Sequence, residues 1–359
     1  MFDIVIVGAG LSGCILARRI AEECDKKVLI IEKRNHIGGD CYDYRDKSGI
    51  LIHKYGPHIF RTDNKKVYDY LSRFTDWVDY QHKVLSYVDG LFYPMPINLD
   101  TVNMFFGTRY NSLNIMRCFN SMKKEIKEIK SVKDVIESQV GEVLYEKFFE
   151  NYTEKQWGMK ADILPKEIVA RIPIRTNRDN RYFTHKYQCL PQNGYTELFK
   201  ELTKHKNIKI MFNTEYKELK DFITASKIFY TGSIDEYYDF KYGKLPYRSV
   251  KFQLERLNVK WYQPVSVVNY PNNYDYTRIT EYKHFYMEDL QQTIISKEYS
   301  CGEGDPSYPI PTKDNIALYN KYKKKAGKDD KKIKFIGRLG EYKYFSMDQI
   351  VENVLNLQI

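Results

Sequence analysis

The chain has 359 residues, a formal net charge of +10 and 15% aromatic residues. This length allows two or three domains with sizeable cores and excludes a small protein held together by disulfides. The six cysteines form no CxxC pair, so the sequence predicts neither a disulfide framework nor a metal site and fits a reducing cytoplasm. No apolar run approaches the roughly 20 residues of a membrane span, so we expect no membrane insertion.

The positive charge is concentrated in two lysine-rich stretches, residues 123–130 and 321–332. We interpret them as solvated helix faces and a loop, and we expect no nucleic-acid partner. Anionic small substrates are compatible with the charge. The 32 tyrosines are more informative, because a phenol ring offers both a stacking face and a hydroxyl donor, which suits sugars and nucleotide bases.

The N-terminal segment predicts a dinucleotide-binding turn. Gly8, Gly10 and Gly13 have GxGxxG spacing directly after the apolar run 4–7. In this pattern a buried strand turns into a helix, and the helix N-terminus holds a pyrophosphate. The alternative is a glycine-rich turn that binds nothing.

A second predicted strand, residues 27–31, indicates which dinucleotide is bound. It ends in Glu32, whose carboxylate can accept a hydrogen bond from a ribose 2′-hydroxyl. Gly38 and Gly39 follow in EKRNHIGG, an extension typical of FAD-binding proteins, because more close-approaching backbone encloses a buried flavin. The predicted cofactor is therefore FAD.

The centre of the chain contains a stretch with a helical pattern and, later, stretches with a strand pattern. Residues 99 to about 160 have helical spacing of apolar positions and predict a small helical domain. Stretches between about 247 and 297 are rich in β-branched and aromatic residues and are spaced like antiparallel strands. The other elements predicted before the C-terminus are helices at 65–74 and 195–204 and strands at 208–212 and 227–232.

The C-terminal segment predicts a strand at 333–336, a glycine turn at 337–340 and a helix that begins near Ser346. Ser346 and Gln349 have the SxxQ spacing of a capping box, which fixes the helix start. The N-terminus of this helix could face the flavin and favour its reduced, anionic form. The alternative is an ordinary surface helix cap.

These patterns predict three interleaved domains. The FAD-binding domain is expected from residues 1–80, about 188–240 and 315–359. The helical domain, for substrate binding and dimerisation, is expected from about 98–170. The sheet domain is expected from about 81–97, 171–187 and 241–314.

Candidate anion-binding residues cluster in RIPIRTNRDNRYF, and guanidinium forks bind phosphate oxygens in pairs, so a diphosphate is a plausible partner. The arginines of this segment are Arg171, Arg175, Arg178 and Arg181, and Arg278 and Arg338 are further candidates. Each of them is also compatible with a structural or surface role. The sequence shows neither a Ser/His/Asp nor a Cys/His constellation.

Aromatic and histidine residues provide the other candidates. Tyr152 and Trp157 in NYTEKQWG could stack on a base or sugar, or form an aromatic plug between domains. His53 and His58 flank a rigid Gly56-Pro57 turn, where they could contact the flavin edge or simply pack.

Together these segments resemble UDP-galactopyranose mutases, flavoenzymes that interconvert the six-membered and five-membered ring forms of UDP-galactose. The resemblance covers nearly the whole chain in family order, and its most specific motifs are YTEKQWG and GRLGEYKY. It implies an α/β fold with a Rossmann-like FAD-binding domain, an inserted helical bundle and a twisted antiparallel β-sheet domain. It also implies a cytoplasmic homodimer, a UDP-sugar substrate, and NAD(P)H or another reductant to reduce the FAD.

The resemblance implies a role for each candidate residue. Arg171, on a mobile loop, and Arg278 would hold the diphosphate, and with His58 they are the implied catalytic residues. Tyr152 would stack on uracil, and Trp157 would lie beside the sugar. The other implied substrate contacts are Tyr182, Asn269, Tyr308, Tyr344 and Arg61. The implied FAD contacts are Gly8, Gly10, Leu11, Ser12, Gly13, Glu32, Lys33, Arg34, Gly38, Gly39, His53, Gly56, His58, Arg338, Tyr344 and Met347.

The implied chemistry involves no net redox change. Reduced flavin N5 attacks the anomeric carbon and expels UDP, and the sugar ring of this adduct opens and closes through a different hydroxyl. The protein residues then bind and position rather than transfer protons, which explains why no acid/base dyad is found. The product would serve cell-surface polysaccharide synthesis in a bacterium.

Two departures from the family pattern bear on specificity. Arg61 stands in HIFRTD where the family usually has a histidine, so we hypothesise that UDP-N-acetylgalactosamine is used beside or instead of UDP-galactose. FSMD at 345–348 replaces the common YDMH and puts the role of the lost carboxylate in doubt. The competing functions are an FAD-dependent amine or sugar oxidoreductase and a non-enzymatic nucleotide-sugar binding protein.

Overall fold

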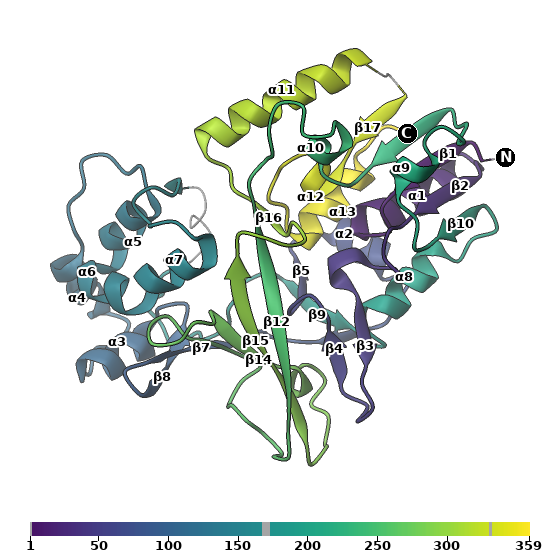
Figure 1. The fold of residues 1–359 in the computed structure, drawn as a ribbon. Coiled ribbons are helices and arrows are strands. Elements are labelled where there is room, and N and C mark those ends of the chain that lie inside the picture. The colour runs from purple at the N-terminus through teal and green to yellow at the C-terminus, as the bar shows by residue number, and fades with distance from the viewer. Residues whose placement is uncertain (1, 167–172, 330–331) are drawn as a thin grey trace.

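The computed structural model describes residues 2–166, 173–329 and 332–359. None of the helices in these ranges is long and apolar enough to cross a membrane. The chain folds into a parallel sheet with helices at one end, a long mixed sheet in the middle and a helical lobe at the other end (Figure 1).

The parallel sheet joins segments from both ends of the chain. Its strands in the described part of the chain have the order β10-β2-β1-β11-β17, and every neighbouring pair is parallel. The strands are β1 (Ile4–Val7), β2 (Val28–Ile31), β10 (Ile208–Met211), β11 (Lys227–Tyr230) and β17 (Ile333–Phe335). Strands buried on both faces are apolar almost throughout, and β1 and β2 consist only of apolar residues. The predicted Rossmann-like architecture is confirmed.

Helices cover this sheet. The helix α1 (Leu11–Glu23) follows β1 and packs against α8 (Tyr195–Thr203) and α13 (Met347–Leu355). The capping position Ser346 begins α13 as predicted, and the Gln349 side chain accepts a hydrogen bond from the Ser346 amide at 3.0 Å. The other helices on this side are α2 (Lys65–Leu71), α9 (Tyr216–Leu219), α10 (Ile234–Tyr237), α11 (Lys313–Asp329) and α12 (Gly337–Gly340).

Two small sheets connect this region to the centre. The strands β3 (Asp43–Arg45) and β4 (Leu51–His53) form a hairpin. The strand β9 (Tyr187–Pro191) lies between β5 (Phe60–Thr62) and β6 (Trp77–Asp79) and is antiparallel to both. Most of their strands belong to the segment that follows Gly38 and Gly39 and leads to the central sheet.

The central sheet has the strand order β16-β12-β15-β14-β13-β7-β8 among the described residues. Its strands are β7 (Val84–Val88), β8 (Leu91–Met95), β12 (Tyr247–Leu257), β13 (Val267–Asn269), β14 (Arg278–Glu281), β15 (Thr293–Cys301) and β16 (Tyr308–Pro309). The expectation of a wholly antiparallel sheet is wrong at one pair, because β13 runs parallel to β7. The segment 276–286 also leaves the sheet after Glu281, where Tyr282–Phe285 form a 3-10 turn.

The helical lobe has its own apolar core. Its helices are α3 (Leu99–Phe106), α4 (Ile115–Met122), α5 (Val132–Val140), α6 (Glu142–Tyr145) and α7 (Asn151–Trp157), with a π-helical turn at Glu146–Glu150. The lysine-rich stretch 123–130 is not a helix face, because α4 ends at Met122 and Lys123 adopts an extended conformation (φ −60°, ψ 141°). Of the second lysine-rich stretch, residues 321–329 form the end of α11.

Candidate functional site

The glycine turn after β1 is fixed by close backbone packing. Gly8 has φ +103°, and a Cβ there would lie 2.1 Å from Thr231 Oγ1. A Cβ on Gly13 would lie 2.0 Å from the Gly8 carbonyl oxygen, so α1 packs on β1 only with glycine at this position. Gly13 therefore has a packing role, as the motif predicts for its third glycine.

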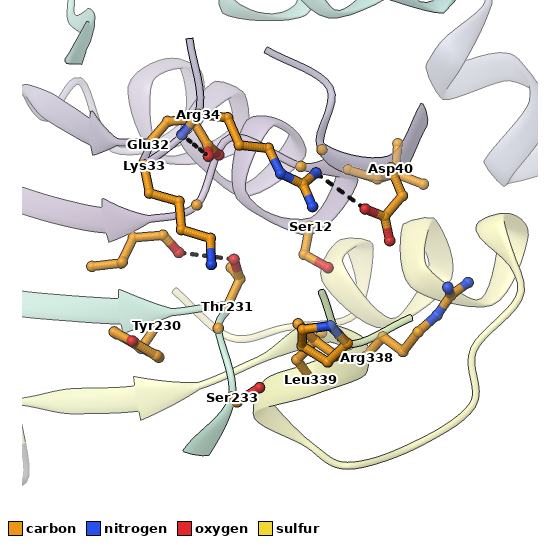
Figure 2. A pocket seen from close by; sticks show the side chains of 18 of the residues that line it. Ser12, Glu32, Lys33, Arg34, Asp40, Tyr230, Thr231, Ser233, Arg338 and Leu339 are labelled. Atoms are coloured by element: carbon orange, nitrogen blue, oxygen red, sulfur yellow. Dashed lines mark hydrogen bonds and ion pairs between the residues drawn. The ribbon is translucent and has the colours of Figure 1, made fainter. Parts of the chain in front are cut away.

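A cavity lies at the carboxyl ends of the parallel strands, where α1 begins (Figure 2). Parallel sheets commonly bind dinucleotides at this edge. We call it the dinucleotide cavity. Its glycine-turn residues are Gly8, Gly10, Leu11, Ser12, Gly38 and Gly39. The backbones of Gly10 and Gly39 approach closely, because a Cβ on Gly39 would lie 3.0 Å from Gly10 Cα.

Six side chains predicted to contact the cofactor also line the dinucleotide cavity. They are Glu32, Lys33, Arg34, His58, Arg338 and Met347. Thr231 and Ser233 in the loop after β11 line it as well, although neither was predicted to contact the cofactor. Gly13, His53, Gly56 and Tyr344 lie outside this lining.

Glu32 is buried and organises the turn around it. Its carboxylate accepts hydrogen bonds from the Ala9 amide at 2.7 Å and from the Arg34 amide at 2.8 Å. Arg34 points across the cavity mouth to Asp40, 3.1 Å away, and its guanidinium lies 4.5 Å from the centre of the Tyr55 ring (Figure 2). The carboxylate keeps acceptor sites for ribose hydroxyls, since each oxygen has two lone pairs.

A hydrogen bond joins the two histidines that flank the Gly56 turn. The His58 amide donates to His53 Nδ1 at 3.1 Å, and His58 Nδ1 donates to the Gly56 carbonyl at 2.8 Å. Burial lowers the pKa of His53 to about 3 and also lowers the pKa of His58. Both rings are therefore neutral near pH 7, and His58 presents Nε2 as a hydrogen-bond acceptor. His53 lies in the core behind the turn.

A largely buried ion pair forms a second centre next to the dinucleotide cavity. Arg278 on β14 lies opposite Glu298 on β15, with Arg278 Nε 3.2 Å from Glu298 Oε1. Burial acts to lower the pKa of Arg278, but Glu298 and nearby phenols outweigh it and raise that pKa. Burial raises the pKa of the Glu298 carboxyl, and Arg278 opposes the rise. Glu298 was not predicted from the sequence, because only the strand register brings it to Arg278.

Four tyrosines that were predicted to bind substrate gather near Arg278. They are Tyr152, Tyr182, Tyr308 and Tyr344, which we call the phenol cluster. The first three interact electrostatically with Arg278, and burial raises the pKa of each of these phenols. Their hydroxyls therefore stay protonated and can donate hydrogen bonds to an anion.

Arg338 links the phenol cluster to the dinucleotide cavity. Its guanidinium lies 5.7 Å from the ring centre of Tyr308 and 5.6 Å from that of Tyr344, and it also lines the cavity. An adjoining cavity is lined by His58, Tyr308 and Arg338 together. Arg338 and Tyr308 thus place the two centres next to each other.

The other predicted substrate residues surround this site. Asn269 on β13 is buried and lies opposite Arg278 in the sheet register. Trp157 ends α7 and packs against the core of the helical lobe. Arg61 on β5 stacks on Phe183, with its guanidinium 3.9 Å from the ring centre. Arg171 lies outside the described residues.

The three other arginines of RIPIRTNRDNRYF bind acceptors within the protein, Arg175 and Arg181 in their own loop and Arg178 on α3. Arg175 is buried and donates to the carbonyls of Asp179 and Arg181. Arg178 pairs with Asp100. Arg181 forms two hydrogen bonds to the Asp179 carboxylate, which lower the pKa of that carboxyl to about 2. These three arginines therefore have structural roles rather than the phosphate-binding role that was also considered.

Comparison with known proteins identifies relatives over the whole chain. A family model described as UDP-galactopyranose mutase matches residues 147–344, and one described as an NAD(P)-binding Rossmann-like domain matches residues 6–74. A probable UDP-galactopyranose mutase of Klebsiella pneumoniae is 40% identical, over 98% of this chain and 93% of that protein. A dTDP-fucopyranose mutase of Escherichia coli is 36% identical, over 99% of this chain and 97% of that protein.

A solved structure agrees with these matches. The crystal structure of a reduced UDP-galactopyranose mutase superposes with a TM-score of 0.79 at 16% identity, covering 99% of this chain and 94% of that one. The likeness in fold spans the dinucleotide cavity, the central sheet and the helical lobe alike. The chain is an isomerase that belongs to the UDP-galactopyranose mutase family.

Proposed function

We propose that the chain interconverts the pyranose and furanose ring forms of a UDP-linked galactose-type sugar, with bound FAD in its reduced state. The observation that carries this proposal is the position of Arg278 and the phenol cluster next to the dinucleotide cavity, to which Arg338 and Tyr308 link them. One end is suited to a dinucleotide cofactor, and the other gathers a permanent cation and protonated hydroxyls suited to a diphosphate.

The residues of the dinucleotide cavity fit FAD. The close approach of Gly10 and Gly39 leaves backbone open toward a pyrophosphate, and Glu32 offers acceptors to a ribose. When bound, reduced FAD supplies the nucleophile that displaces UDP from the sugar. The neutral His58 faces this cavity with an acceptor nitrogen, so it can orient a donor there without adding charge.

Arg278 and the phenol cluster would bind the diphosphate. As the bond to the sugar breaks, negative charge grows on the departing UDP, and pre-placed donors stabilise it without reorganising. Glu298 holds the guanidinium of Arg278 in place. Retaining UDP beside the open sugar favours recapture over hydrolysis. None of these roles needs an acid/base pair among the side chains.

The expected result of an activity assay follows from this scheme. Incubated with the furanose form of UDP-galactose and a catalytic amount of dithionite, the purified protein should yield the pyranose form with no net use of reductant. Chromatography of the nucleotides measures this. Steady consumption of reductant would instead indicate an oxidoreductase, and absence of conversion a binding protein. The oxidoreductase is not favoured, because relatives matched over the full length are mutases.

We propose NAD(P)H as a physiological reductant, the cytoplasm as the site of action and a homodimer as the assembly. Exposed apolar side chains of the helical lobe, such as Met104, Leu113 and Met116, support an interface between copies there.

Family membership does not determine which sugar is the substrate, because one relative at similar identity is a dTDP-fucopyranose mutase. We propose that Arg61 favours UDP-N-acetylgalactosamine. Its guanidinium is stacked on Phe183 and interacts electrostatically with Tyr182 of the phenol cluster, so it lies at the edge of the substrate site. A guanidinium offers several donors in a fixed plane, which suits an acetamido carbonyl.

The variant Arg61→His should lower the preference for the N-acetylgalactosamine nucleotide over the galactose nucleotide. Losing one substrate hydrogen bond costs about 1–3 kcal/mol, so the ratio of kcat/KM values should fall about 5- to 150-fold. The assay should also include dTDP-fucose. Arg73→His, which replaces an exposed arginine paired with Glu22, serves as the control. An unchanged preference in Arg61→His contradicts the assignment.

A further inference from the structure

Lys155, in the specific motif YTEKQWG, has no part in the function proposed above. It lies on α7, and its ammonium donates to three backbone carbonyls of one loop: those of Tyr270, Tyr274 and Tyr276, the last two at 2.9 and 3.1 Å. This loop connects β13 to β14 and leads directly into Arg278. One side chain of the helical lobe thus fixes three points of a hairpin loop in the central sheet.

Lys155 is held in an environment that disfavours its charge. Burial lowers its pKa to about 8, and Asp275 in the same loop opposes this change. An ammonium withdrawn from water needs several hydrogen-bond acceptors in compensation. The three loop carbonyls provide them, so the loop conformation and the lysine position depend on each other.

The C-terminal end of α7 is attached to the central sheet as well. The carbonyls of a last helical turn have no partners within the helix. Here the Gln156 carbonyl accepts from Arg248 Nε at 3.0 Å and from the Ser300 hydroxyl, and the Lys155 carbonyl accepts from Arg248 at 3.2 Å. Gly158 makes this approach possible, because a Cβ there would lie 2.6 Å from an Arg248 nitrogen.

Further hydrogen bonds join the loop to the helical lobe, and in one of them the Asn151 side chain at the start of α7 donates to Asn272 Oδ1 at 3.3 Å. Asn272 donates to the Lys147 carbonyl at 3.1 Å, within the π-helical turn that precedes α7. Turns of this kind leave carbonyls available to partners outside the helix. The hairpin loop and α7 are therefore docked against each other along their length.

We propose that Lys155 is a positioning residue, which sets the placement of Tyr152 on α7 relative to Arg278 on β14 by locking the hairpin loop to the helix. Tyr152 lies three residues before Lys155, nearly one turn along the same helix, and interacts electrostatically with Arg278 across the site. This inference rests on the proposed binding of a UDP-sugar by those two residues. Lys155 itself acts through them and does not touch the substrate.

The test compares FAD-loaded wild type, Lys155→Met, Lys155→Arg and the control Lys147→Met. The Lys147 side chain lies in the same helical segment but pairs with the exposed Asp89. Lys155→Met should weaken UDP binding about tenfold and lower kcat/KM by at least that factor, because the groups that hold the diphosphate, and that stabilise it as it departs, are displaced. Lys155→Arg keeps the charge and several donors and should restore most of the affinity.

Amide hydrogen exchange of the UDP-free proteins gives an independent readout. Residues 270–277 should exchange faster in Lys155→Met than in wild type and Lys147→Met. Unchanged exchange there, or unchanged UDP affinity despite faster exchange, overturns the inference. Failure of the wild type to bind UDP would instead count against the proposed function, while the exchange comparison still decides the role of Lys155. If Lys155→Met does not retain FAD, Lys155→Gln replaces it with the same expectations.

Discussion

Replacing Arg278 with methionine should lower kcat/KM for the UDP-sugar by on the order of 10³-fold, the loss expected when one partner of a close, desolvated charge pair is removed. The guanidinium is the centre of the phenol cluster and is held by Glu298 at 3.2 Å. The variant loses the diphosphate contact and also leaves a carboxylate buried without its cation. Steady-state kinetics under reducing conditions measures the first effect, and thermal unfolding measures the second.

A second substitution separates these two effects. Breaking a buried pair by removing one partner costs about 3–5 kcal/mol, because the other charge is left uncompensated. Adding Glu298→Gln to Arg278→Met removes that charge, so the melting temperature should recover while activity does not. Arg181→Met, which removes an arginine paired with Asp179 in a loop, should keep activity within about threefold. Recovery of activity together with stability would contradict a direct role for Arg278.

The cofactor half of the site was predictable because its signals are local. A strand, a turn with positive φ at Gly8 and a helix that packs through Gly13 follow one another within ten residues, and each glycine is required by the backbone itself. The strands that complete the parallel sheet, β10, β11 and β17, were also predicted, because short stretches rich in isoleucine and aromatic residues and bounded by turns are typical of strands.

The residues proposed to bind substrate were named only through resemblance, because they come from distant segments of the chain. Glu298 shows the physical limit. Its place beside Arg278 follows from the pairing of β14 with β15, and a shift of one residue in that register would turn it to the other face of the sheet.

The arginine-rich loop shows a second limit. Composition alone made Arg175, Arg178 and Arg181 candidates for phosphate binding, whereas the fold turns each toward an internal acceptor. The side chain of an arginine reaches far enough that its partner depends on the path of the loop, and that path is not encoded in the spacing of the arginines. The same holds for the lysines of 123–130, whose charge pattern resembled a helix face.

The variant Gly10→Ala should keep the fold and lose FAD. Gly10 has φ −82° and ψ −172°, an extended conformation that alanine adopts freely, and the nearest atom to an added Cβ is Gly39 Cα at 3.8 Å. The protein alone therefore has room for the methyl group. The bound cofactor does not, if its pyrophosphate lies against this turn, and overpacking of that kind costs about 1–3 kcal/mol. The Kd for FAD should rise about 5- to 150-fold, measured by titrating apoprotein with FAD.

Two further alanine variants serve as controls for this prediction, one expected to destabilise the fold and one expected to be neutral. Gly13→Ala places a Cβ 2.0 Å from the Gly8 carbonyl and should destabilise the protein with or without FAD, seen as a lower melting temperature of the apoprotein. Gly327→Ala on α11, where nothing lies within 4 Å, should change neither FAD affinity nor the fold adversely. If Gly10→Ala bound FAD as tightly as wild type, the pyrophosphate would have to lie elsewhere in the cavity, and the assignment of the glycine turn to cofactor binding would fail.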